Sequence, residues 1–178
     1  MLATPAQLFA LLDDLGISHR SVSHEPLFTV EQSRSLRGQI PGGHTKNLFL
    51  RDKRGCYLVV ALEDASIDLK ALSRRLGASG RFSFGSAQAM WETLGVEPGS
   101  VTPFAVVNDR DGRVRVVLDS TMMACEVLNY HPLVNTMTTA ISPNDLLRFL
   151  RATGHEPHIA PVARAQAEPG TEPLASPL

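Results

Sequence analysis

Apolar residues recur along the chain at helical and strand-like spacings, separated by segments rich in turn residues. Leucines on one face predict a helix over residues 3–15, with Thr4 as its N-cap, Pro5 in its first turn and Gly16 as its stop. Residues 17–24 alternate enough in polarity to predict a strand. The chain is therefore expected to open with a helix followed by a strand.

The middle of the chain predicts two hairpins. Strands over residues 45–51 and 56–62 flank a turn signal at residues 52–55, which reads Asp-Lys-Arg-Gly. Two further apolar runs, at residues 104–107 and 114–118, flank a second run of turn residues. We expect each pair of strands to be antiparallel.

Caps and stop glycines mark the remaining elements. The predicted helices cover residues 29–38, 67–76 and 86–94, and a last one begins after Ser142. Short strands are predicted over residues 82–84 and 136–141. Hairpins interleaved with helices predict an α+β fold with a mixed, largely antiparallel sheet or partial barrel flanked by helices.

Composition changes near the C-terminus. From Pro161 onward the chain is rich in Ala, Pro, Glu and Ser and has no apolar periodicity. We therefore predict one folded domain over residues 1–160 and a disordered tail over residues 161–178. The N-terminus has neither a basic segment nor a long apolar run, so a cytoplasmic protein without a membrane span is expected.

The net charge and the spacing of potential metal ligands argue against two classes of function. A formal net charge of -1 argues against nucleic-acid binding by charge alone, although it leaves room for a local basic patch. The pairs His19/His24 and His155/His158 lack a third ligand at metal spacing, and the two cysteines form no CxxC. We expect no metal and no cofactor.

Four short segments occur in the order and spacing of one known family. They are residues 24–26 (HEP), 43–50 (GHTKNLFL), 99–103 (GSVTP), and 131–135 (HPLVN) followed by Thr138. Together they resemble the prolyl-tRNA editing domains, and in particular the freestanding prolyl-tRNA editing proteins, over about residues 1 to 158. The resemblance implies a metal-free aminoacyl-tRNA deacylase on a mixed α/β fold. Alanyl-tRNA(Pro) is the best-fitting substrate, and a related subgroup acts on cysteinyl-tRNA(Pro).

The resemblance also implies a site. Its catalytic residues are Lys46, Asn47 and His131. Its substrate-binding residues are Val30, Leu48, Gly99, Ser100, Val101, Thr102, Pro103, Tyr130 and Asn135. Without the family, Lys46 and Asn47 are ordinary strand residues that face opposite sides, and residues 99–103 are a turn before a strand. Val30, Leu48 and Tyr130 are equally well explained as core, and His131 as a packed imidazole.

An aminoacyl ester on tRNA is already reactive, so these site residues could promote its hydrolysis without a strong nucleophile. Positioning the ester, a water and a proton carrier can supply roughly 7–11 kcal/mol of the barrier. In the family a ribose hydroxyl of the substrate is thought to assist. Cys125, six residues before His131, is a weaker thiol alternative.

The expected partners are the aminoacylated acceptor end of tRNA and prolyl-tRNA synthetase. Candidate tRNA contacts are Arg34, Arg37, Arg51, Lys53, Arg54, Lys70, Arg74 and Arg75. The hairpin turn that carries Arg51, Lys53 and Arg54 is the best single candidate. Two alternatives remain: a cysteinyl-tRNA(Pro) or broader deacylase, and a non-catalytic module that binds tRNA or a synthetase.

Overall fold

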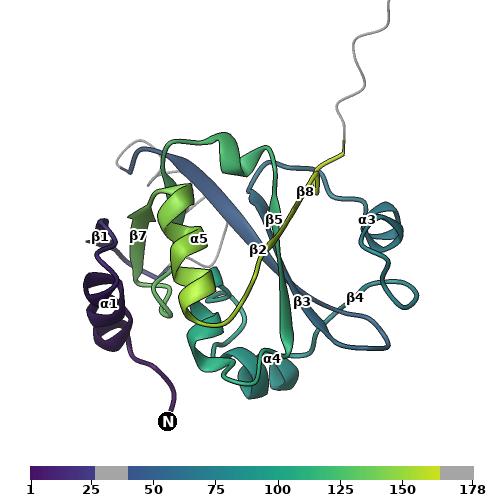
Figure 1. Cartoon of the computed structure of the whole chain (residues 1–178), viewed down its shortest axis with the longest axis horizontal. Coiled ribbons are helices and arrows are strands. Elements are labelled where there is room, and N and C mark those ends of the chain that lie inside the picture. The colour runs from purple at the N-terminus through teal and green to yellow at the C-terminus, as the bar shows by residue number, and fades with distance from the viewer. Residues whose placement is uncertain (27–39, 165–178) are drawn as a thin grey trace, which may run out of the picture.

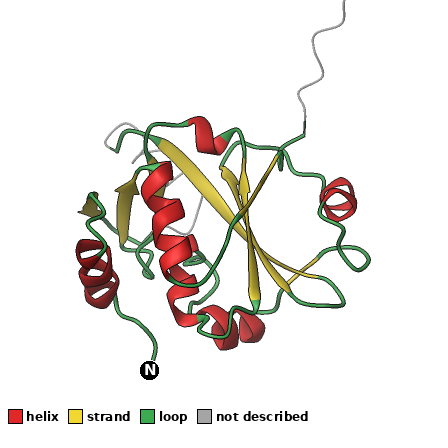
Figure 2. Cartoon of the chain, viewed as in Figure 1, coloured by secondary structure: helices red, strands yellow, loops and turns green. Residues whose placement is uncertain are grey.

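An eight-stranded sheet organises the protein (Figure 1; Figure 2). The computed structural model describes residues 1–26 and 40–164, so the helix predicted over residues 29–38 lies outside the described residues. The strands are β1 (His19–Ser23), β2 (Gly43–Arg51), β3 (Cys56–Leu62), β4 (Ser83–Phe84), β5 (Val114–Asp119), β6 (Leu128–Tyr130), β7 (Met137–Ile141) and β8 (His158–Ala160). The helices are α1 (Pro5–Asp14), α3 (Leu69–Arg75), α4 (Ala87–Leu94) and α5 (Pro143–Ala152), with the 3-10 helices η1 (Pro103–Asn108) and η2 (Met122–Ala124).

The sheet is mixed. Its strands follow the order β1-β7-β6-β2-β3-β5-β8, and β4 pairs with β2 off this path. The pairs β1–β7, β6–β7, β2–β3 and β2–β4 are antiparallel. The pairs β2–β6, β3–β5 and β5–β8 are parallel. The predicted α+β class with a mixed sheet flanked by helices is therefore confirmed.

Two apolar cores lie on opposite faces of the sheet. The large core contains Leu12 of α1, Leu94 of α4 and Phe149 of α5, all fully buried. The smaller core contains Leu72 of α3 packed near Leu50 of β2. Figure 1 shows α5 lying across one face of the sheet, and α3 at the end of the molecule far from α1. Burial of each such side chain contributes about 1.5–3 kcal/mol, so the large core dominates the stability of the fold.

Capping side chains fix the helix starts where the sequence predicts them. Thr4 forms a capping box with Gln7: the Thr4 amide donates to the Gln7 side-chain oxygen at 3.0 Å. The Ser86 hydroxyl accepts from the Ala89 amide at 3.1 Å, and the Ser142 hydroxyl starts α5 in the same way. These side chains satisfy amides that have no partner inside the helix.

The predicted second hairpin is wrong. Residues 104–107 belong to the 3-10 helix η1, because Thr102 caps the Phe104 amide and Pro103 occupies the first helical position. Strand β5 instead pairs in parallel with β3 and β8. The three-residue strands β6 and β8 were not predicted at all.

The last described residues are held by the domain. The Asp119 carboxylate accepts from the Val162 amide at 2.7 Å, and the Arg164 amide donates to the Ser66 carbonyl at 2.7 Å. These contacts continue past residue 160, where the sequence predicts the domain to end. None of the helices within residues 1–26 and 40–164 is long and apolar enough to cross a membrane.

Candidate active site

Strand β2 sends its side chains alternately to the two cores. Phe49 belongs to the large core and Leu50 to the smaller one. Asn47 shares the face of Phe49, whereas Lys46 shares the face of Leu48 and Leu50. The side chains of Lys46 and Asn47 therefore point to opposite faces of the sheet, as expected for a regular strand.

Lys46 is half-buried and is held by a backbone acceptor. Its ammonium group donates to the carbonyl of Ala65, in the loop that follows β3. Leu48, two residues on, packs against the smaller core. A hydrogen-bonded ammonium at a partly buried position is a fixed positive charge, which is the property needed to attract a negatively charged oxygen.

Asn47 has an unsatisfied polar atom. Its Oδ1 atom is buried and has no hydrogen-bond partner within the described residues. A buried carbonyl oxygen without a partner costs roughly 1–3 kcal/mol, so such a group often has a binding role.

Strands β2 and β6 separate next to Lys46. Their parallel pairing joins Gly43 to Leu128 and His44 to Asn129, and the Thr45 hydroxyl donates to the Asn129 carbonyl at 2.9 Å. Beyond this point β6 ends, while β2 continues beside β3. Lys46 directly follows Thr45, and His131 directly follows Tyr130, the last residue of β6. Both residues therefore come just after the point where the two strands separate.

His131 lies on the side of the sheet away from the large core. Along β6 the buried Leu128 and Tyr130 enter the large core, so Asn129 and His131 alternate to the other side. The same alternation along β1 and β7 places Arg20, Val22, His24, Thr138 and Ala140 there. We call this side of β1, β7 and β6 the outer face.

Two imidazoles meet on the outer face. The centroids of the His24 and His131 rings are 6.4 Å apart. His24 Nε2 lies 2.9 Å from the Thr138 hydroxyl, and its Nδ1 lies 2.8 Å from the Glu25 carbonyl. His131 Nδ1 lies 3.0 Å from the Met137 carbonyl, which fixes the hydrogen on this nitrogen and leaves Nε2 as the proton acceptor.

Burial makes His131 a neutral base. Desolvation lowers the pKa of His131, and the nearby charge of His24 lowers it further, while the hydrogen bond to the Met137 carbonyl partly opposes both effects. A lowered pKa keeps the imidazole neutral at pH 7. Within the described residues its Nε2 atom has no hydrogen-bond partner, so it can hold a water or accept a proton.

The loop at residues 99–103 lies on the large-core side. Thr102 and Pro103 are buried, and Val101 packs against the large core. Gly99 is exposed and has a φ of 91°, with no atom near the position of a Cβ. The Ser100 amide donates to the Glu97 carbonyl at 3.0 Å. Within the described residues no hydrogen bond joins this loop to Lys46 or His131.

The loop reaches the neighbourhood of His131 through aromatic packing. Phe104, which follows the loop, packs edge-on against Tyr130 with ring centroids 5.8 Å apart. Tyr130 is 2% exposed, and its hydroxyl lies 3.5 Å from the Met122 sulfur. Burial raises the pKa of Tyr130, so its hydroxyl stays protonated. Tyr130 is therefore a core residue that directly precedes His131 in the chain.

The other predicted residues are placed as follows. Asn135 is half-buried in the segment between β6 and β7, and Val30 lies outside the described residues. Cys125 packs against the large core, on the side of the sheet opposite His131. The structure thus gathers Lys46 and His131 on one side, and it leaves the loop, Tyr130 and Cys125 on the other.

His24 and Thr138 lie beside His131 in the candidate site, and the sequence did not assign them a role. Both occur in the segments that carry the family resemblance, so the signal was present. Their contact depends on the β1–β7 pairing, in which Val22 lies opposite Thr138. That pairing joins residues more than a hundred positions apart and has no local signature.

The basic residues at the β2–β3 turn are exposed. Arg51, Lys53 and Arg54 surround Asp52, whose carboxylate accepts from the Arg54 and Gly55 amides at 2.7 and 2.9 Å. The Asp52 carboxylate therefore holds the backbone of the turn, and three basic side chains are exposed around it. Arg34 and Arg37 lie outside the described residues, and Arg75 donates to the Pro161 carbonyl.

Comparison with known proteins agrees with this architecture. Residues 24–149 match the family described as "Aminoacyl-tRNA editing domain". The chain is 40% identical over 163 residues to "Prolyl-tRNA synthetase associated domain-containing protein 1" of Bos taurus, covering 86% of this chain and 95% of the relative. It is 35% identical over 150 residues to "Prolyl-tRNA editing protein ProX" of Acetoanaerobium sticklandii, covering 83% and 91%. The crystal structure of hypothetical protein APE2540 superposes with a TM-score of 0.70 at 21% identity, covering 88% of this chain and 99% of that one.

The match over residues 24–149 identifies the fold as that of an aminoacyl-tRNA editing domain. More particularly, the chain belongs to the aminoacyl-tRNA editing domain family, with freestanding prolyl-tRNA editing proteins among its relatives. The resemblance drawn from the four sequence segments is confirmed.

Proposed function

We propose that the protein hydrolyses the ester bond of mischarged alanyl-tRNA(Pro) in trans. Family membership and the likeness to a prolyl-tRNA editing protein support an editing role. The observation that carries the proposal is the placement of a held ammonium, Lys46, and a neutral imidazole, His131, beside the point where β2 and β6 separate.

In the proposed reaction, water attacks the ester carbonyl carbon. The bond between that carbon and the ribose oxygen breaks, and the ribose oxygen takes up a proton, so the products are alanine and a tRNA with a free terminal hydroxyl. Lys46 offsets the negative charge that develops on the carbonyl oxygen. His131 holds the attacking water through Nε2, and the neighbouring ribose hydroxyl helps to move the proton.

Substrate choice is proposed to depend on size. A synthetase for proline cannot strongly reject the smaller alanine, so a second site that admits alanine and excludes proline removes the error. Leu48, Val30 and Asn135 are the proposed walls of this amino-acid site. Residues 99–103 and Tyr130, which lie on the large-core side of the sheet, are not proposed to contact the amino acid. Asn47 is proposed to join the site through its buried Oδ1 atom, next to the point where β2 and β6 separate.

The proposed domain covers residues 1–164, because the contacts of Val162 and Arg164 support an end beyond residue 160. The proposed partners are the acceptor end of tRNA and prolyl-tRNA synthetase. A deacylase that acts on cysteinyl-tRNA(Pro), or on a broader range of substrates, would use Lys46 and His131 in the same way and differ in the volume of its amino-acid pocket. A non-catalytic module that binds tRNA or a synthetase would use the fold without turnover.

A deacylation panel tests the proposal. Purified protein is given tRNA(Pro) charged with alanine, cysteine, serine or proline, and release of each amino acid is measured over time. Rapid loss of alanine with proline retained is the expected result. Preferred loss of cysteine would support the related activity, whereas binding of tRNA with no turnover of any ester would support the non-catalytic module.

A further inference from the structure

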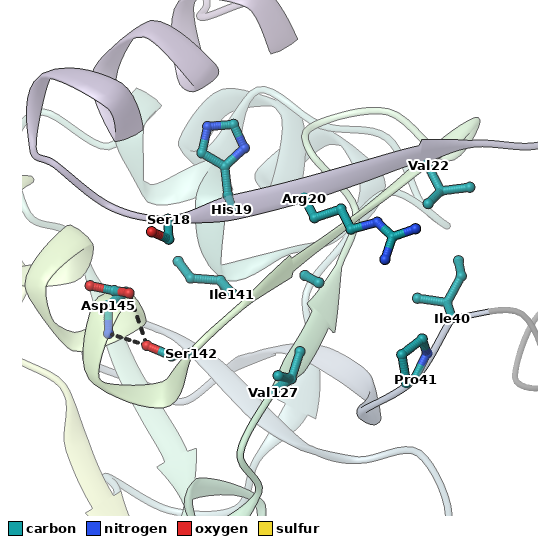
Figure 3. A pocket seen from close by; sticks show the side chains of 11 residues that line it. Ser18, His19, Arg20, Val22, Ile40, Pro41, Val127, Ile141, Ser142 and Asp145 are labelled. Atoms are coloured by element: carbon teal, nitrogen blue, oxygen red, sulfur yellow. Dashed lines mark hydrogen bonds between the residues drawn. The ribbon is translucent and has the colours of Figure 1, made fainter.

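A separate cavity of about 410 Å³ opens at the other end of the outer face (Figure 3). Its apolar walls come from Val22, Ile40, Val127 and Ala140. Figure 3 shows the Arg20 side chain extending along this cavity from β1 toward Ile40. The volume is in the range of small-molecule sites and holds a group of the size of a nucleotide.

The cavity and the two imidazoles share one surface. Arg20 and Val22 of β1, and His24 directly after it, all lie on the outer face. Arg20 pairs with Ala140 and Val22 with Thr138 of β7. The His24 amide donates to the carbonyl of Thr136, the residue before β7. Four residues of strand separate Arg20 from His24, a distance of about 13 Å. A few nucleotides of single-stranded RNA span this distance, since stacked nucleotides rise roughly 3.4 Å each.

Arg20 is the unpaired cation at this cavity. Within the described residues its exposed side chain makes neither a hydrogen bond nor an ion pair. The carboxylate of Asp145, at the opposite wall, is bound to Arg148 at 2.8 Å and to the Ser142 hydroxyl at 3.0 Å. Among residues 1–26 and 40–164, the positive charge of Arg20 therefore has no counterion.

His19 does not contribute its ring to the cavity. Its Nε2 atom lies 3.1 Å from an Asp13 oxygen, and its ring stacks on Phe9 of α1 with centroids 5.3 Å apart. In Figure 3 the ring points away from the cavity, toward the helix above. The cavity thus offers one guanidinium group and an aliphatic floor.

We propose that this cavity binds a nucleotide of the unpaired 3′ end of the tRNA, upstream of the terminal adenosine that carries the amino acid. The aliphatic walls cover the face of one base, and the Arg20 guanidinium pairs with its phosphate. This inference rests on the proposed function, because it assumes that the ester lies beside Lys46 and His131. It adds the path by which the RNA strand crosses the outer face.

The binding test uses the full chain and the unacylated RNA 5′-ACCA-3′. Replacing Arg20 with Gln should weaken binding about tenfold, the loss of one charge-assisted contact. Ala140→Leu, which fills the cavity, should weaken it similarly. Arg110→Gln, at an exposed turn before β5, is the matched control and should bind like the wild type. Amide NMR signals of residues 20, 22 and 140 should shift when the RNA is added.

Kinetics separate this inference from the proposed function. With alanyl-tRNA(Pro), Arg20→Gln should raise KM about tenfold and leave kcat unchanged, because the contact is the same in the ground and transition states. With the alanyl ester of adenosine alone, which lacks the upstream nucleotides, the variant should equal the wild type.

Two results would overturn the nucleotide site. One is an Arg20→Gln protein that binds ACCA as tightly as the wild type; the other is a set of RNA-induced shifts confined to the turn at residues 51–54. Either result leaves hydrolysis by the wild type intact. Conversely, a wild type without any deacylase activity removes the proposed function, and the RNA-binding measurement still decides the cavity.

Discussion

The His24 and His131 rings lie 6.4 Å apart, with their planes tilted by 55°, and two consecutive residues of β7 hold them. The Thr138 hydroxyl contacts His24 at 2.9 Å, and the Met137 carbonyl contacts His131 at 3.0 Å. At this separation the charge of His24 is one of the causes that lower the pKa of His131.

Replacing His24 with Gln should raise the pKa of His131. The positive charge of protonated His24 is one cause of the lowered value, and its removal leaves burial as the main cause, so the pKa should stay below its usual range. NMR titration of the His131 ring measures the change. His158→Gln, at an exposed position on β8, is the control. An unmoved His131 titration would show that the two rings are not coupled.

Replacing Lys46 with Ala should slow deacylation of alanyl-tRNA(Pro) by at least ~10-fold, about 1.4 kcal/mol in the barrier. The reason is loss of the fixed charge that the Ala65 carbonyl holds in place. Single-turnover rates measure the effect, with Arg110→Ala, an exposed cation outside the candidate tRNA contacts, as the control. A normal rate in the Lys46 variant would remove this residue from the chemistry.

Asp109 should make the fold sensitive to acid. Burial raises its pKa, but hydrogen bonds from the Val114 amide at 2.7 Å, the Arg113 amide at 3.1 Å and His155 at 3.1 Å outweigh burial and lower it. A lowered folded-state pKa stabilises the fold above the ordinary carboxyl pKa, about 3.9, and this stabilisation disappears as the pH falls through the folded value.

Asp109→Asn should therefore reduce the free energy of unfolding at pH 7 by about 2–3 kcal/mol and flatten its decline below pH 4. Denaturant unfolding at a series of pH values checks both effects. Asp111→Asn, an exposed neighbour in the same turn, should leave the curve unchanged. Equal acid dependence in the Asp109 variant and the wild type would contradict the assignment.

Asp119 should anchor the segment that follows β8. Its buried carboxylate accepts from the Val162 amide at 2.7 Å, the Ala163 amide at 3.3 Å and the Met122 amide at 3.2 Å. Asp119→Ala should cost about 2–3 kcal/mol of stability, because these amides lose a charged acceptor. Thermal unfolding measures the loss.

Two truncations complete this test and locate the end of the domain. A chain ending at Arg164 should melt like the full chain, whereas one ending at Ala160 should be destabilised as Asp119→Ala is. Identical melting of both truncated chains would instead favour a domain that ends at residue 160.

Local chemistry was enough to predict much of the fold. The β2–β3 hairpin follows from two apolar runs around Asp-Lys-Arg-Gly, and Thr4, Ser86 and Ser142 cap their helices as expected. The error at residues 104–107 came from reading a short apolar run as a strand, although Thr102-Pro103 is a helix-start signal. A short, buried apolar segment is compatible with either a strand or a helix, so its sequence alone does not distinguish them.

The residues of the candidate site were proposed from sequence motifs, whereas their arrangement was not predictable. Lys46 and His131 were found by motif, yet their neighbourhood depends on the parallel pairing of His44 with Asn129, 85 positions apart. Such pairing leaves no periodicity in either segment, and β6 has only three residues. For the same reason the loop at residues 99–103 could not be assigned to the large-core side from sequence.

Strand β2 joins the two parts of the sheet. Among the described strands it alone pairs both with β6, on the side of β7 and β1, and with β3, on the side of β5 and β8. Neither part can detach without breaking a ladder of β2, so the domain should lose its structure in one cooperative transition. Backbone amides of β7 and β5 should then exchange with one common free energy of opening, so the two groups of strands should unfold together.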